Sequence, residues 1–120
     1  MKLSAVAINE AANVLATGSI DKSVRLWDCR GSSSRFPIQI LDDAKDSIGD
    51  VIFGFTEIVV GSIDGSVRIY DIRIGKMMQD VVNEPVTSLM LSGDGLCYIA
   101  SCLDSSVRLV DKSDGAILNT

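Results

Sequence analysis

The sequence predicts an all-β fold of three four-stranded antiparallel sheets, and two observations carry this prediction. First, one stretch occurs three times in the 120-residue chain, at 18–28, 61–71 and 101–111. Its turn aspartates lie 43 and then 40 residues apart, a period typical of four-stranded propeller blades. Second, no segment has the 3.6-residue apolar period of an amphipathic helix. We therefore expect a partial β-propeller of three blades that form one domain, residues 1–120.

Each copy of the stretch has the composition of a β-hairpin. An apolar run leads to a short turn, which we expect Asp to open as the first residue of a type I turn, because its side chain can accept backbone N–H bonds there. The run after the turn, Val24–Asp28 in the first copy, is rich in the β-branched and aromatic residues that favour strands. An isolated hairpin is only marginally stable, so the copies are expected to stack on one another.

The first predicted unit spans residues 3–41. Its apolar runs predict strands at 3–8, 14–18, 23–28 and 37–41. Asn9–Asn13 supplies the first turn, and the polar stretch Arg30–Arg35 forms a loop before the fourth strand. The acidic stretch 41–46 then crosses to the second unit.

The second and third units, residues 47–82 and 86–119, repeat this plan. Strands are expected at 47–53, 57–62, 66–71 and 76–82, and then at 86–91, 97–101, 106–111 and 116–119. Asn83–Pro85 crosses between the units, and Ser92–Gly95 is a strong turn signal. The fourth strand should be outermost in each unit.

Three blades are fewer than the four to eight of typical closed propellers. Two apolar end faces would then be open to solvent, and faces of this kind promote association. The chain is therefore expected either to belong to a longer propeller or to be a truncated or engineered partial propeller that mainly self-associates.

Composition excludes several classes of partner. The net charge of −5 and the absence of a basic cluster argue against direct nucleic-acid binding. No apolar run is long enough for a membrane helix. Three cysteines without zinc spacing favour a reducing compartment, so we expect a cytoplasmic and nuclear protein.

No catalytic or metal-binding constellation is recognisable. The chain has no His, which removes Ser-His-Asp and Cys-His catalysis. Asp42-Asp43 is interpreted as a solvated crossing loop, and 111–115 lacks the acidic spacing of a calcium loop. We expect a protein that is not an enzyme and needs no cofactor or metal.

The repeated stretch resembles the core of a WD repeat, and the resemblance covers residues 3–119. In that family the turn Asp, a strand Ser or Thr, a Trp and a His form a hydrogen-bonded tetrad. Tyr70 and Val110 depart from the Trp position that Trp27 matches, and without His no unit has the full tetrad. The resemblance marks as structural repeat positions Asp21, Trp27, Asp28, Asp64, Tyr70, Asp71, Asp104 and Asp111.

Within the WD-repeat family, four segments (27–30, 41–46, 67–73 and 105–112) are similar in their order to the mitogen-activated protein kinase organisers. Those proteins are scaffolds associated with kinase cascades and with the spliceosome. The resemblance implies a non-enzymatic protein-interaction scaffold whose partners are proteins or peptides, among them kinase-cascade or spliceosomal components.

Two further hypotheses concern basic residues. Segments 27–30 and 70–73 resemble the aromatic-Asp-x-Arg box of receptors that dock on a cullin-ligase adaptor, with Arg30 and Arg73 as the docking residues. Arg25, Arg68 and Arg108 either pack their stems with the guanidinium at a blade edge or form a ring that meets an acidic partner. The residues proposed for partner contact, chosen by position, are Arg30, Arg35, Lys45, Arg73 and Lys76.

Overall fold

The fold is all-β, as predicted. The computed structural model describes residues 3–8, 14–28, 39–54, 57–71, 76–81, 84–92, 97–103, 107–111 and 117–119. Within these ranges the chain forms three four-stranded antiparallel sheets. None of the described segments is a helix with the length and apolar character needed to cross a membrane.

The strands follow the predicted order. The first sheet contains β1 (Leu3–Ile8), β2 (Val14–Ser19), β3 (Val24–Asp28) and β4 (Gln39–Leu41). The second contains β5 (Ile48–Phe53), β6 (Glu57–Ser62), β7 (Ser66–Asp71) and β8 (Lys76–Val81). The third contains β9 (Val86–Leu91), β10 (Cys97–Cys102), β11 (Val107–Asp111) and β12 (Ile117–Asn119). The predicted strand ends at 37, 82, 106 and 116 lie outside the described residues.

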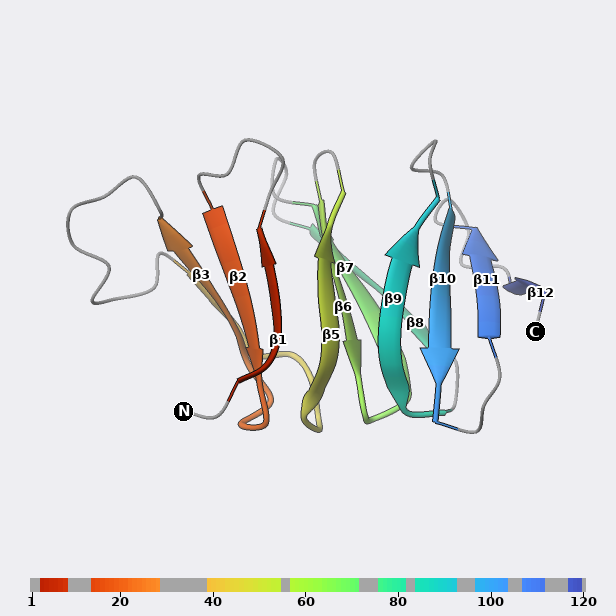
Figure 1. The fold of residues 1–120 in the computed structure, drawn as a ribbon, viewed down its shortest axis with the longest axis horizontal. Coiled ribbons are helices and arrows are strands. Elements are labelled where there is room, and N and C mark those ends of the chain that lie inside the picture. Colours follow the sequence, from red (N-terminus) through yellow and green to blue (C-terminus); the bar gives the residue numbers. More distant parts are fainter. Residues whose placement is uncertain are drawn as a thin grey trace.

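The three sheets stand side by side in chain order (Figure 1). Each sheet runs from its first strand to its fourth, so β4, β8 and β12 are the outer strands, as predicted. The first strands β1, β5 and β9 are neighbours. The central sheet is therefore covered on both faces, while the first and third sheets are each covered on one.

Two apolar seams hold the sheets together. The first seam lies between the first and second sheets and contains Ala5, Ala16, Val24, Leu26, Ile48, Val51, Ile58, Val60 and Tyr70. The second seam lies between the second and third sheets and contains Val59, Val67, Ile69, Val86, Leu89, Tyr98, Ala100, Cys102 and Val110. Consecutive residues of a strand point to opposite faces, so Val59 and Val60 enter different seams. This two-sided burial explains the uninterrupted apolar run Ile58–Val60 in β6.

Glycines allow the sheets to approach closely at each seam. A Cβ on Gly18 would lie 2.5 Å from Cγ2 of Ile48, and a Cβ on Gly61 would lie 2.5 Å from Cγ1 of Val86. Gly18 and Gly61 are equivalent positions of the repeat, as are Ile48 and Val86, because Ile48 pairs with Ser62 and Val86 pairs with Cys102. Both seams thus use the same contact.

In each sheet, one pair of facing residues on the second and third strands contains a single aromatic side chain. The three equivalent pairs are Leu15–Trp27, Ile58–Tyr70 and Tyr98–Val110. In the third sheet the aromatic residue lies on the second strand instead of the third. Val110 stands at the Trp position of β11, and Tyr98 lies directly opposite on β10. The departure of Val110 from the WD pattern is thereby compensated in volume, because Tyr98 is fully buried in the second seam.

The predicted position of Asp in the turn is wrong. The amide of Lys22 donates to the carbonyl of Ser19, and the amide of Gly65 donates to that of Ser62. Asp21 and Asp64 are consequently the third residues of their four-residue turns. The fourth residues have left-handed backbones, with φ of 76° for Lys22 and 88° for Gly65, which is typical of a three-residue hairpin loop.

Candidate functional site

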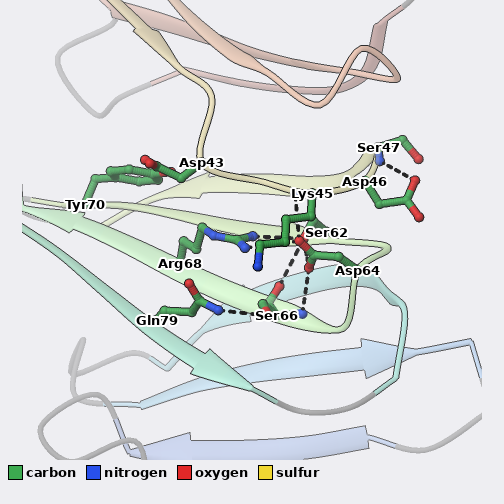
Figure 2. A network of polar contacts seen from close by, with 10 residues as sticks. All are labelled: Asp43, Lys45, Asp46, Ser47, Ser62, Asp64, Ser66, Arg68, Tyr70 and Gln79. Carbon is green, nitrogen blue, oxygen red and sulfur yellow. Dashed lines mark hydrogen bonds and ion pairs between the residues drawn. The ribbon is translucent and has the colours of Figure 1, made fainter.

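A polar network surrounds Asp64 in the turn between β6 and β7 (Figure 2). Its Oδ1 accepts hydrogen bonds from the Ser66 amide at 3.0 Å and from the Ser62 hydroxyl. Its Oδ2 accepts one from the Lys45 amide at 2.8 Å and forms an ion pair with Arg68 Nη2 at 3.1 Å. One carboxylate thus ties together the turn, the start of β7 and the connector between β4 and β5.

The Asp64–Arg68 pair is shielded from water. The side chain of Asp64 is 9% exposed, and that of Arg68 is buried on the face that meets the first sheet. Burial raises the pKa of Asp64, but the bonds from Ser62, Lys45 and Arg68 outweigh it, so the pKa lies below its usual value. The two charges therefore neutralise each other inside the seam. Arg68 Nη1 also donates to Ser62 Oγ at 3.2 Å, whereas its buried Nε has no hydrogen-bond partner among the described residues.

The first sheet has a related network around its turn aspartate, and this network is more exposed to solvent. Asp21 Oδ1 accepts from the amide and the hydroxyl of Ser23 at 3.1 and 2.6 Å, and Oδ2 pairs with Arg25 Nη1 at 3.1 Å. The hydroxyls of Ser19 and Ser23 lower the pKa of Asp21. The side chain of Asp21 is 44% exposed, since no sheet covers this face.

The arginine series does not form a ring open to a partner. Arg68 is buried in the first seam and paired with Asp64, and Arg25 is bonded to both Asp21 and Ser23. In the third sheet Arg108 Nη1 lies 3.1 Å from the sulfur of Cys102, which takes the place of Ser19 and Ser62. Asp104 lies outside the described residues. Both predicted alternatives for Arg68 are therefore wrong, because its guanidinium stabilises the hairpin turn from within.

The aromatic positions are anchored by different polar partners. Trp27 Nε1 donates to Thr17 Oγ1 at 2.9 Å, which is the Trp–Thr contact that the WD-repeat resemblance implies. The Tyr70 hydroxyl donates to Asp43 Oδ2 at 3.0 Å, reaching the connector because Val60 occupies the position of Thr17. Burial, and next the bond to Asp43, raise the pKa of Tyr70, so its hydroxyl remains a donor.

The residues proposed for partner contact are dispersed in the fold. Arg30, Arg35 and Arg73 lie outside the described residues. Lys45 has an exposed side chain on the connector, at the turn end of the second sheet. Lys76 begins β8 and pairs with Asp71, at the other end of β7. Because a strand rises about 3.4 Å per residue, these two lysines are separated by roughly 17 Å along the sheet.

The aspartates after the aromatic position close the third strand of each sheet. Asp28 pairs with Val14, Asp71 with Glu57, and Asp111 with Cys97. They therefore share one end of the sheets, opposite to the turns that contain Asp21 and Asp64. Seven of the eight structural repeat positions are described, and they form two groups toward opposite ends of the sheets rather than one site; the eighth, Asp104, lies outside the described residues.

The coupling of the turn Asp to Arg is the feature that the sequence analysis missed. The signal was present, because Asp and Arg are four residues apart in all three copies. Among the described residues no group of three His, Cys, Asp or Glu side chains could hold a metal ion. The described polar networks stabilise the hairpin turns.

Comparison with known proteins agrees with this architecture. Residues 2–28 match the family model "WD domain, G-beta repeat". WD repeat domain-containing protein 83 of Rattus norvegicus is 47% identical over 82 residues, which are 68% of this chain and 26% of the relative. The WD repeat domain-containing protein 83 homolog of Dictyostelium discoideum is 31% identical over 137 residues, 91% of this chain and 42% of the relative.

A more distant relative is the COMPASS component SWD3 of Saccharomyces cerevisiae, 24% identical over 122 residues, 93% of this chain and 39% of the relative. The chain thus spans less than half the length of each of these three proteins. Their names say nothing of kinase cascades or splicing. The family model and the relatives together support the WD40 repeat family.

Proposed function

Since the chain carries WD40 repeats, we propose that it is a non-enzymatic scaffold that binds protein or peptide partners and acts as one domain. The observation that supports this is the fixed connector between β4 and β5. Its backbone is bonded to Asp64 through the Lys45 amide, and Asp43 is bonded to Tyr70, while the Lys45 side chain is exposed. A charged side chain on an anchored backbone binds a partner at a smaller entropic cost than one on a free loop.

The partners that we propose are components of kinase cascades or of the spliceosome, in the cytoplasm and the nucleus. This finer proposal rests on the resemblance to the kinase organisers. The name of SWD3 describes a component of a complex, which is consistent with an assembly role for WD40 chains in general. The relatives' names include no enzymatic activity.

The test is affinity capture with the purified chain as bait. Wild type, Lys45→Glu and Lys22→Glu are compared, because Lys45 on the connector and Lys22 in the first hairpin turn are both exposed and both changes reverse one charge. We expect kinase-cascade or spliceosomal proteins on the wild type and on Lys22→Glu, and their loss on Lys45→Glu. Capture that is equal for all three chains would refute the connector as the contact site, and capture of neither class would refute the proposed partners.

A second candidate function is docking on a cullin-ligase adaptor. It is favoured by the equivalent placement of Asp28 and Asp71 at the ends of β3 and β7, which puts the aromatic-Asp pairs that begin the two boxes at the same end of neighbouring sheets. The double variant Arg30→Ala and Arg73→Ala should abolish pull-down of the purified adaptor. Unchanged pull-down would eliminate this function without affecting the first one.

A further inference from the structure

We propose that the free edge of β8, the outer strand of the second sheet, is a docking surface for a second copy of this chain, and that two such strands pair antiparallel about a two-fold axis. The proposal is independent of the scaffold function. It concerns an internal strand, so it requires nothing of the residues at either end of the chain.

β8 is an open sheet edge. The second sheet has the order β5-β6-β7-β8, so among the described strands β8 is hydrogen-bonded to β7 alone. Alternate residues of an edge strand direct their amide and carbonyl groups away from the sheet, where another strand can pair with them. One side of β8 therefore offers main-chain donors and acceptors to a partner.

β8 lacks the features by which edge strands commonly avoid pairing. Such strands are very short, bulged, interrupted by proline or charged along their length. β8 pairs with β7 at all six of its positions, from Lys76 to Val81, without a shift in register. It contains no proline, and its three central residues, Met77, Met78 and Gln79, are uncharged and exposed.

The other two outer strands are less suited to pairing. β4 and β12 are described over three residues each. The register of β12 also shifts against β11. The second sheet is therefore the one whose described outer edge is long and regular enough to accept a further strand.

The two methionines expose apolar surface on both faces of this edge. Met77 is 38% exposed and Met78 is 47% exposed. Met78 lies opposite Ile69, which belongs to the second seam, and Met77 lies opposite Tyr70, which belongs to the first seam. A strand added to β8 would cover the outer margin of both seams. Methionine suits such a contact, because its unbranched side chain adapts to the surface it meets.

The order of residue types along β8 indicates the occupant. In a two-fold symmetric pair of antiparallel strands, one residue faces its own copy. With Met78 at the axis, Lys76 faces Asp80 of the other copy, and Met77 faces Gln79. The dimer then has two facing pairs of unlike charge, which stabilise antiparallel strands. With Met77 or Gln79 at the axis, no unlike charges of β8 face each other, so the strand is complementary to itself in one register.

The same register brings apolar residues together. Residues that face each other in an antiparallel pair lie on the same face of the sheet, so Met78 of the two copies would meet on the face of the second seam. Met77 would lie beside Gln79 of the other copy on the face of the first seam. The product is one antiparallel sheet of eight strands, made of two four-stranded sheets.

Disulfide cross-linking tests the register. Met78→Cys should link two copies, because facing Cα atoms of antiparallel strands lie about 4.5–5.5 Å apart and a disulfide spans this distance. Met77→Cys alone should not link, since position 77 of the other copy lies on the diagonal at about 7–8 Å. Mixed with Gln79→Cys, it should link. Each variant is oxidised with glutathione disulfide, and mass spectrometry of the linked peptides separates these bonds from bonds of the native cysteines.

The matched control is Ile40→Cys. It places a thiol at an apolar residue of β4 that is 50% exposed, close to the exposure of Met78. This variant should remain unlinked under the same conditions. Circular dichroism checks that every variant stays folded.

Charge reversal tests whether the occupant is a second copy. Lys76→Glu and Asp80→Lys each place like charges at both facing pairs, so each variant alone should dimerise about tenfold more weakly than the wild type in analytical ultracentrifugation. Mixed in equal amounts, the two variants should associate as tightly as the wild type, because every facing pair then has unlike charges.

Three outcomes would each overturn the proposal. They are a wild type that sediments as a monomer at every concentration, a Met78→Cys variant that links no better than Ile40→Cys, and charge variants that do not associate when mixed. Association through another surface of the chain would raise the mass without a cross-link at position 78, and so would also refute pairing through β8.

Discussion

Asp21 and Asp64 occupy equivalent turns, and solvent reaches them to very different extents. Both accept bonds from the following Ser and both pair with the Arg four residues later. An exposed pair contributes little, because water and salt screen it. In a buried pair, removal of one partner leaves the other charge uncompensated.

Replacement of Asp64 should therefore lower the free energy of unfolding more than replacement of Asp21. Asp64→Asn should lower the free energy of unfolding by about 3–5 kcal/mol, because Arg68 would keep its charge inside the first seam. Asp21→Asn should lower it by about 1 kcal/mol or less. Urea unfolding followed by circular dichroism measures both, and equal losses would show that burial does not govern the two pairs.

Acid should weaken the fold through the same carboxylates. The pKa values of Asp21 and Asp64 are lower in the folded chain than in the unfolded chain, where Asp titrates near about 3.9. Their contribution is complete above that pH and is lost as the pH falls toward the folded values.

We therefore expect the urea midpoint of the wild type to fall below pH of about 4. Asp64→Asn should show a smaller fall over the same range, since it lacks one of the two groups. A midpoint that changes equally in both chains would exclude Asp64 as a source of the acid sensitivity.

Residue roles could be predicted from the sequence only where a contact is local or belongs to a known pattern. The sequence marks Trp27 as a structural repeat position, and the bond from its indole to Thr17 follows the WD pattern. The bond from Tyr70 to Asp43 was not foreseeable, because it joins residues 27 positions apart whose approach depends on the path of the connector. The partner-contact role of Lys45 stays a prediction.

The hairpin turns differ at their fourth residue, where Lys22 has the left-handed backbone that Gly65 adopts without a Cβ. A side chain is strained in this conformation, and glycine is not. The twelve strands were predictable because apolar runs and turn residues alternate along the chain. The turn geometry was not, since several turn types accept Asp.

Exchange of the two turn residues tests this strain. Lys22→Gly should raise the free energy of unfolding by about 0.5–1 kcal/mol, and Gly65→Lys should lower it by at least as much. Thermal unfolding of the two variants beside the wild type measures both effects. A loss of stability in Lys22→Gly would mean that the Lys22 side chain makes contacts worth more than the strain.

Stacking of the three sheets depends on the absence of a side chain at Gly18 and Gly61. The repeat period predicted three stacked units, because it appears directly in the sequence. The seams themselves were not predictable in detail, since they depend on which residues of adjacent sheets come into register.

Gly61→Ala should loosen the second seam. The new Cβ would lie 2.5 Å from Val86 Cγ1 and 3.3 Å from Leu89 Cδ1, so the third sheet must shift. Overpacking of this kind costs about 1–3 kcal/mol, measured as a lower urea midpoint. Ser101→Ala is the control, because Ser101 is equivalent to Gly61 by strand register and none of the described sheets lies against it. This change should alter stability by less than about 0.5 kcal/mol.

The three cross-strand pairs with one aromatic ring each have a consequence for how such repeats can diverge. Val110→Trp alone would place a second ring opposite Tyr98 in a filled seam, and Tyr98→Leu alone would leave a hole there. Either single substitution should therefore destabilise the third sheet, whereas changing both members together keeps one ring in the pair. The two facing residues of a hairpin thus form one unit of substitution, in which the side chain tolerated on one strand is set by the side chain opposite.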